Sequence, residues 1–450
     1  MINRSELLDK GTDRSRKVKT HVLLSLIYRG VNLLLGLIML PLVLSYVNNE
    51  EYGIWVTLFS IITLFQFIDV GLDGGFRNKF AISLAKKNNE DAKYYVSTTY
   101  AATCIIATFV FIALFTANFY INWVEVLNTS DIYGNNLKIL FLFVLGSFLL
   151  TLMLKTVITM LVADQKPSIP NLTSLIQKIL QVISVWLLII LTKGSLLKLG
   201  ITFSIIPVVV LLFFNIYYFS TLYESYRPRF KYIKISYLKD IMNLGIKFFI
   251  IKIAVVVLFA TDNIIITQLF GPEDVTTYQV ANKYFGMGLM LFLIPTQAIW
   301  SAVTEAYHKD DFKWIKKAVN KMIKLWLILF IVILVMLLTY PFIFKLWLNG
   351  KVIVPYSLSI GWASFVLLQS FNAIFVNVIN GIGKVKIQLF TAINTMIINI
   401  PLSIFFAKTL NLGVAGIIYA TSVSIIISIV LRLVQYRKLM NGTATGVWNE

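Results

Sequence analysis

The sequence predicts an all-α polytopic membrane protein with about twelve transmembrane helices. Hydrophobic residues make up 58% of the 450 residues, and charged residues only 14%. A water-exposed globular surface needs roughly 25% charged residues, so lipid must cover most of this chain. The apolar residues also fall into runs of about 20 residues or more, which is the length of a helix that spans a bilayer.

Twelve apolar runs meet this length. They cover residues 22–46, 54–72, 95–117, 137–162, 172–192, 198–222, 241–269, 278–304, 322–344, 352–379, 387–407 and 412–434. The first run is too long for the core of a secretory signal peptide and ends without a cleavage site, so we interpret it as a first span. The connections are too short to hold a soluble domain.

The distribution of Lys and Arg predicts the orientation. The even-numbered loops and the two tails hold 26 of these cations, whereas the odd-numbered loops hold five. Since short basic loops stay in the cytoplasm, both termini are expected there. This gives a basic N-terminal tail, an N-terminal lobe, a basic cytoplasmic linker, a C-terminal lobe and a C-terminal tail, at residues 1–21, 22–222, 223–240, 241–434 and 435–450.

The composition argues against several classes of protein. The net charge of +19 is divided among short loops, which argues against nucleic-acid binding. One Cys excludes an intramolecular disulfide framework, and the two His residues are too far apart for a metal motif. No zinc-protease motif or phosphate-binding loop occurs, so neither an enzyme nor a cofactor is expected. Without a nucleotide-binding domain, any work that the protein performs would draw its energy from an ion gradient, from the membrane potential or from consumption of its product by a later step.

Three pairs of short strings repeat at nearly half the chain length. NNEEYGIW at 48–55 parallels GPEDVTTYQ at 271–279, and two further pairs follow in the same order, 162–169 with 380–387 and 198–206 with 411–419. The offset equals six spans, an even number. The two lobes would therefore share one orientation and be related by a pseudo-two-fold axis along the membrane normal.

Positive side chains inside the spans predict a substrate cavity. Arg29, Lys155, Lys178 and Lys247 lie one to two turns inside the predicted cytoplasmic ends, and Lys252 lies deeper, at roughly 16 Å. An anionic substrate would be attracted to such a cluster. Snorkelling and ion pairs between helices are the alternative for each of them. Lys138, Lys324 and Arg432 lie near predicted span ends, where snorkelling is expected.

Acidic and amide residues give three weaker predictions. Asp262 and Lys283 lie at similar depths in neighbouring spans, which predicts an ion pair or a proton- or sodium-coupling site. A cytoplasmic gate or cap network is expected from Asp69, Asp73 and Arg77, which follow helical spacing. Two amide residues, Asn263 and Gln297, are expected to contact polar groups of a substrate.

Four longer strings resemble a known family. They are FIDVGLDGGFRNKFAISLAKKN at 67–88, TDNIIITQLFGPEDVTTYQVANKYF at 261–285, NGIGKVKIQ at 380–388 and LNLGVAGIIYATSVS at 410–424. They are similar to segments of polysaccharide biosynthesis transporters, more specifically the O-antigen and oligosaccharide repeat-unit flippases. That family belongs to the superfamily shared with multidrug and toxin extruders and the peptidoglycan lipid flippase.

The resemblance implies a substrate and partners. An undecaprenyl-pyrophosphate-linked oligosaccharide would move from the cytoplasmic to the periplasmic leaflet of the bacterial inner membrane, with H⁺ or Na⁺ as a counter-ion and polysaccharide polymerase or assembly proteins as partners. The cationic cluster would bind the pyrophosphate of this substrate, and Asn263 and Gln297 would contact its sugar hydroxyls. A cation-coupled drug antiporter of the same superfamily is the main alternative, although the spans carry more basic than acidic residues. A membrane-embedded polysaccharide enzyme would need a large loop with paired acids, and the sequence has no such loop.

Overall fold

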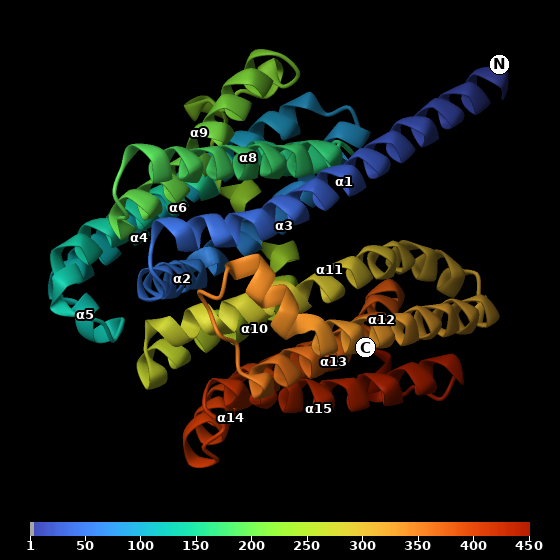
Figure 1. Cartoon of the computed structure of the whole chain (residues 1–450). Coiled ribbons are helices and arrows are strands. Elements are labelled where there is room, and N and C mark those ends of the chain that lie inside the picture. Colours follow the sequence, from blue (N-terminus) through green and yellow to red (C-terminus); the bar gives the residue numbers. More distant parts are fainter. Residues whose placement is uncertain (1–3) are drawn as a thin grey trace. The chain divides into compact units, whose positions relative to one another are not determined.

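The structure is a computed structural model. It describes the backbone of residues 4–450 and the side chains outside residues 1–19, 22, 67–71, 243–259, 297, 298 and 301. Every regular element in the described part is helical (Figure 1). The α-helices are α1 (Arg4–Tyr46), α2 (Asn49–Thr63), α3 (Phe67–Ala85), α4 (Asn89–Tyr120), α5 (Trp123–Val126), α6 (Gly134–Leu154), α7 (Thr156–Ala163), α8 (Ser168–Leu191), α9 (Leu196–Ser220), α10 (Ile235–Phe270), α11 (Pro272–His308), α12 (Phe312–Leu348), α13 (Tyr356–Ile382), α14 (Lys386–Ile404) and α15 (Val414–Met440).

Nine helical segments within the described residues are long and apolar enough to cross a membrane. They coincide with nine of the twelve predicted runs. The other three runs, 54–72, 241–269 and 278–304, fall in α2–α3, α10 and α11, each of which includes side chains outside the described residues. The prediction of an all-α, multi-span membrane protein is confirmed.

Two predicted spans are each divided between two α-helices. The run 54–72 is interrupted by a 3₁₀ turn at Leu64–Gln66, which separates α2 from α3. Three β-branched residues, Ile61 to Thr63, come directly before this turn and disfavour a regular helix there. The run 137–162 is interrupted at Lys155, between α6 and α7. Hydropathy measures only apolar content, so it could not detect either break.

The chain divides into two compact units. Unit 1 comprises residues 1–48, 65–126 and 130–249, and unit 2 comprises residues 49–64, 127–129 and 250–450. A core in unit 1 gathers Phe76 and Phe80 of α3, Val96 of α4 and Met160 of α7. The buried residues of unit 2 include Phe285 of α11, Phe365 of α13 and Ile417 of α15. The division into lobes at 22–222 and 241–434 stays a prediction.

One pair of repeated strings meets inside unit 2. The string at 48–55 opens α2, and its counterpart at 271–279 opens α11. The Thr276 hydroxyl donates to the backbone oxygen of Asn49 over 2.6 Å. A side chain added at Gly53 would lie only 1.7 Å from the backbone oxygen of Pro272. Glycine at position 53 therefore allows the two helices to approach this closely.

Candidate functional site

Three of the five predicted cavity cations have described side chains, and all three lie in unit 1. Arg29 of α1 is exposed, and its Nε donates to Oδ1 of Asn171 on α8 over 3.1 Å. Lys178 of α8 is half-buried, and Lys155 is exposed between α6 and α7. Lys247 and Lys252 are on α10, and their side chains lie outside the described residues.

Helices α1 and α8 pack side by side in unit 1 (Figure 1). Polar side chains form a stripe along their contact. Besides Arg29 and Asn171, Asn32 donates to the hydroxyl of Ser174 over 2.8 Å. Lys178 lies four residues beyond Ser174, so it continues the same face of α8 by one turn. The structure thus aligns Arg29 and Lys178 along the α1–α8 pair, whereas Lys155 lies between α6 and α7.

The geometry of Arg29 suits an oxyanion ligand. The contact with Asn171 uses one of the five N–H donors of the guanidinium. In the part of the chain that the structure describes, no other hydrogen bond or ion pair engages Arg29, and its side chain is exposed. The amide fixes the plane of the guanidinium while its terminal nitrogens can bind a phosphate through two parallel bonds.

Asp262 of α10 is buried in unit 2, with 1% of its surface exposed. Its Oδ2 accepts a hydrogen bond of 2.9 Å from the hydroxyl of Tyr278 on α11, and its Oδ1 has no hydrogen-bond partner among the described residues. The ring of Tyr278 packs on Trp362 of α13, and in the part of the chain that the structure describes the indole Nε1 also has no partner. One buried tyrosine therefore contacts two residues, Asp262 and Trp362, that each keep a polar atom without a partner among the described side chains.

The structure does not bring Asp262 and Lys283 together as an ion pair. The Lys283 ammonium lies over the ring of Tyr52 in α2, 6.0 Å from its centroid. Tyr278 is the group that meets the carboxylate. Similar depth in two neighbouring spans does not fix the rotation of each helix, and the side chains here point to different neighbours.

Asn263 belongs to a second buried network in unit 2. Its Nδ2 donates to the hydroxyl of Ser60 over 2.9 Å, and its Oδ1 accepts from Nε2 of Gln279 over 2.8 Å. Gln279 in turn accepts from Asn282 over 3.1 Å. Both ends of the Asn263 amide are thus engaged by protein, so a sugar would have to displace one of these bonds. Gln297 lies outside the described side chains.

The three residues of the predicted gate or cap network lie on α3 in unit 1. Asp73 accepts a short hydrogen bond from the hydroxyl of Thr159 on α7. Arg77 is exposed, and the side chain of Asp69 lies outside the described residues. Among the described contacts, Asp73 is joined to α7 and not to Arg77.

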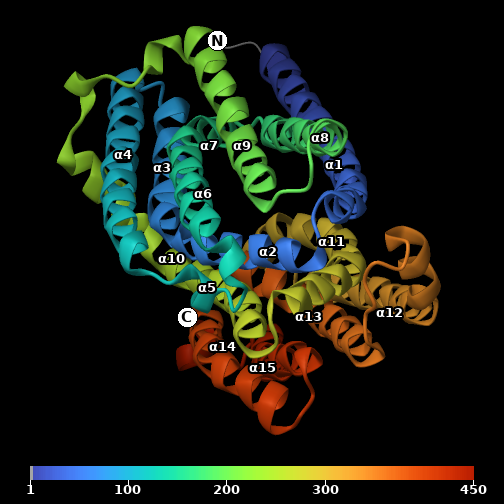
Figure 2. The same ribbon diagram turned by 60° about the vertical axis from the view of Figure 1, so that its left-hand side comes forward.

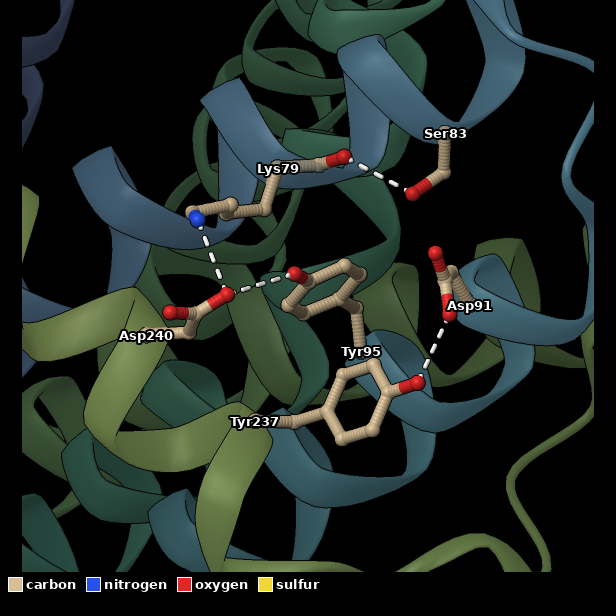
Figure 3. A network of polar contacts seen from close by, with 6 residues as sticks. All are labelled: Lys79, Ser83, Asp91, Tyr95, Tyr237 and Asp240. Carbon is tan, nitrogen blue, oxygen red and sulfur yellow. Dashed lines mark hydrogen bonds and ion pairs between the residues drawn. The ribbon is translucent and has the colours of Figure 1, made fainter.

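A network that the sequence did not predict fastens α3, α4 and the start of α10 in unit 1 (Figure 3). Asp240 accepts from the Lys79 ammonium over 2.9 Å and from the Tyr95 hydroxyl over 3.0 Å. The hydrogen bonds from Lys79 and Tyr95 hold the pKa of Asp240 below its usual range. Beside them, the Tyr237 hydroxyl donates to Asp91 over 2.6 Å. The linker is therefore tied at its end to the helices of unit 1.

Sequence models of two families match the chain. The model described as Polysaccharide biosynthesis protein matches residues 18–301, which is more than half of the chain. The chain belongs to this family. The model described as MatE matches residues 248–405.

Similar proteins agree with membership in the polysaccharide biosynthesis family. A protein of Yersinia pseudotuberculosis, named as a candidate O-antigen export protein, is 22% identical over 431 residues, covering 92% of this chain and 94% of its own. A protein of Salmonella typhi, named as a candidate O-antigen transporter, is 22% identical over 285 residues, or 62% of each chain.

Solved structures show which fold this family member adopts. An inward-facing multidrug resistance MATE family transporter has a TM-score of 0.76 at 14% identity, covering 93% of this chain and 98% of its own. The lipid II flippase MurJ in an inward closed conformation has a TM-score of 0.70 at 17% identity, covering 94% and 90%. A transporter of the same superfamily from Pyrococcus furiosus has a TM-score of 0.69 at 14% identity, covering 96% of both chains. The chain therefore has the fold of these transporters.

The snorkelling prediction for Arg432 is wrong. This residue of α15 is only 6% exposed and donates to Oδ1 of Asn372 on α13 over 2.5 Å and to the hydroxyl of Thr391 on α14 over 3.3 Å. Ser424, Ser428 and Gln435 are buried on the same helix. Their spacing of three or four residues marks a polar inward face, and this signal could have identified Arg432 as a buried residue.

Proposed function

We propose that this protein is a flippase for lipid-linked oligosaccharide repeat units. It would move undecaprenyl-pyrophosphate-linked units to the outer leaflet of the bacterial inner membrane, for O-antigen, capsule or exopolysaccharide synthesis. The observation that carries the proposal is the match of residues 18–301 to the polysaccharide biosynthesis family. Relatives named for O-antigen export and the shared fold with a lipid flippase support it.

The finer architecture is part of the same proposal. Twelve spans would form two six-helix lobes with both termini in the cytoplasm, and alternating access would expose the cavity to each leaflet in turn. The meeting of two repeated strings at the start of α2 and α11 supports a pseudo-two-fold axis. An axis of this kind brings equivalent segments together wherever it passes close to them.

The cations supply the substrate chemistry in this proposal. Arg29, oriented by Asn171, would bind the pyrophosphate through its terminal nitrogens, with Lys178 farther along the stripe. Lys155, Lys247 and Lys252 would add positive charge from α6–α7 and α10. The lipid tail could stay in the bilayer while the sugars occupy an aqueous cavity. Asp262 would take up H⁺ or Na⁺ as the coupling group, since its Oδ1 is buried and has no partner within the described part of the chain.

Complementation of a flippase-deficient strain tests the proposal. Lys252→Ala and Arg29→Ala are each expected to lower surface polysaccharide strongly, because the pyrophosphate of the substrate would lose a positively charged partner inside the membrane. Lys345→Ala is the matched control, since this exposed lysine lies in the last turn of α12. Protein levels are compared by immunoblot.

Two outcomes would contradict different parts of the proposal. Normal export with Lys252→Ala, at normal expression, removes that residue from the cavity. Failure of the unmodified protein to restore polysaccharide in any matched strain argues against the flippase itself.

A drug antiporter is the second candidate, because the MatE family model matches residues 248–405. Its cavity would have to bind organic cations. Expression in a strain that lacks its drug efflux pumps separates the two. The flippase is expected to leave resistance to cationic dyes unchanged, whereas an antiporter would raise it.

A further inference from the structure

The linker that joins the predicted lobes exposes large apolar side chains among cations. Phe230 is 94% exposed and Ile235 is 69% exposed. All five cations of the segment 223–240 are exposed, and only two acids accompany them, Glu224 and Asp240. Asp240 is already paired with Lys79. The exposed surface is thus both apolar and positively charged; its cations are Arg227, Arg229, Lys231, Lys234 and Lys239.

This surface is held in place because the backbone of the linker is hydrogen-bonded to side chains of α4. The N–H of Arg229 donates to the hydroxyl of Ser97, and the N–H of Lys234 donates to that of Thr98, both over 3.1 Å. The Tyr237 and Asp240 contacts of Figure 3 fasten the following turn. Phe230 therefore projects from a segment whose backbone is anchored by hydrogen bonds on both sides, at Arg229 and Lys234.

The linker contacts α4 at the position along the helix where the apolar run begins. Ser97 and Thr98 lie at the start of the apolar run 95–117, just after the polar first turns of α4. Farther along, α4 exposes Ile105 and Phe109, 70% and 73% accessible, as expected for a face that contacts acyl chains. Figure 2 shows the linker following the outside of α4. The linker thus lies beside the part of α4 where the apolar run begins, which is where headgroups are expected.

Two lysines of the linker make cation–π contacts with tyrosine rings in this region. The Lys234 ammonium lies 4.1 Å from the ring centroid of Tyr94, and that of Lys231 lies 4.8 Å from the ring of Tyr232. Tyrosine is enriched at membrane–water interfaces because its ring is apolar and its hydroxyl is polar. Lysines held over such rings still present N–H donors to a phosphate.

We propose that residues 227–235 bind anionic phospholipid headgroups at the membrane surface. Phe230 and Ile235 enter the boundary of the acyl region, while Arg229, Lys231 and Lys234 contact lipid phosphates. This interaction concerns the surrounding bilayer and does not depend on which substrate the cavity carries. It would give the protein a requirement for anionic lipid that its transport site alone does not create.

Fluorescence quenching in lipid nanodiscs tests the inference on the full-length protein. The native Cys104, which is exposed, is replaced by Ala, and a Phe230→Cys variant is labelled with bimane. Brominated phosphatidylglycerol is expected to quench the label more than brominated phosphatidylcholine at the same mole fraction. Iodide in the buffer should quench it weakly. Ile235→Cys gives a second labelling position, and size-exclusion profiles verify folding.

Two controls assign the effect to headgroup binding. Ile132→Cys is the matched control, since Ile132 is 86% exposed, follows Asp131 and has no neighbouring cations in its segment. A label at this position is expected to show no preference for phosphatidylglycerol. Replacing Arg229, Lys231 and Lys234 by Gln should abolish the preference at position 230, because each cation contributes up to about fivefold to local anionic lipid enrichment.

The inference has clear contrary results. Strong iodide quenching at position 230 without quenching by either lipid would place the surface in water. Equal quenching by the two brominated lipids would show insertion without headgroup recognition, which also overturns the proposal.

Discussion

Replacing Asp262 by Asn is expected to lower export by about 5–150-fold, the usual size of a coupling between two binding sites. Asn keeps the volume of the side chain and an oxygen that can accept from Tyr278, but it cannot take up or release a proton. Transport assayed in proteoliposomes should also lose its response to an imposed pH or sodium gradient. Asn377→Ala is the control, because the Asn377 amide is buried in the same unit and donates to a backbone oxygen of its own helix.

The Tyr278→Phe variant distinguishes coupling from a purely structural role. Removing the hydroxyl deprives Asp262 of its hydrogen-bond donor and should shift the pH dependence of transport without abolishing it. If Asp262→Asn exports at the wild-type rate and keeps its response to ion gradients, Asp262 serves only to accept the tyrosine hydroxyl.

The second large effect is expected from two adjacent glycines of α3. A methyl group added at Gly75 would lie 2.0 Å from the backbone oxygen of Ile241, so α3 and α10 would have to move apart. Overpacking of this kind costs about 1–3 kcal/mol. A methyl group at Gly74 meets nothing within 4 Å, and alanine there should stabilise the helix by roughly 0.5–1 kcal/mol.

Thermal unfolding in detergent compares the two glycine variants. Gly75→Ala should melt at a lower temperature than the wild type, and Gly74→Ala at the same or a higher one. Equal melting temperatures for the two variants would mean that α3 and α10 are not in close contact at this point.

Much of the fold followed from the sequence because the bilayer imposes a strong constraint. Each spanning helix must be long and apolar, so nine segments could be located from composition alone. The breaks at Leu64–Gln66 and Lys155 were missed, since they lie inside apolar runs and carry no Gly or Pro.

The candidate site was harder to predict because depth along a helix does not fix its rotation. Arg29 was found from its charge, but its partner Asn171 lies 142 residues away in the sequence. Asp262 was selected as a buried acid, yet the group beside it is Tyr278 and not Lys283. Tertiary packing decides such pairs, and a single sequence contains little information about it.

The buried Arg432 has a consequence for how the protein is assembled. An unpaired arginine inside an apolar helix makes insertion of that helix unfavourable, by up to about 2.5–3.5 kcal/mol at the helix centre and by less toward the end, where Arg432 lies. Its two acceptors, Asn372 and Thr391, belong to helices that are synthesised before α15. We expect α15 to enter the membrane most readily beside α13 and α14 that are already in place. Biogenesis of this region would then follow the order of translation.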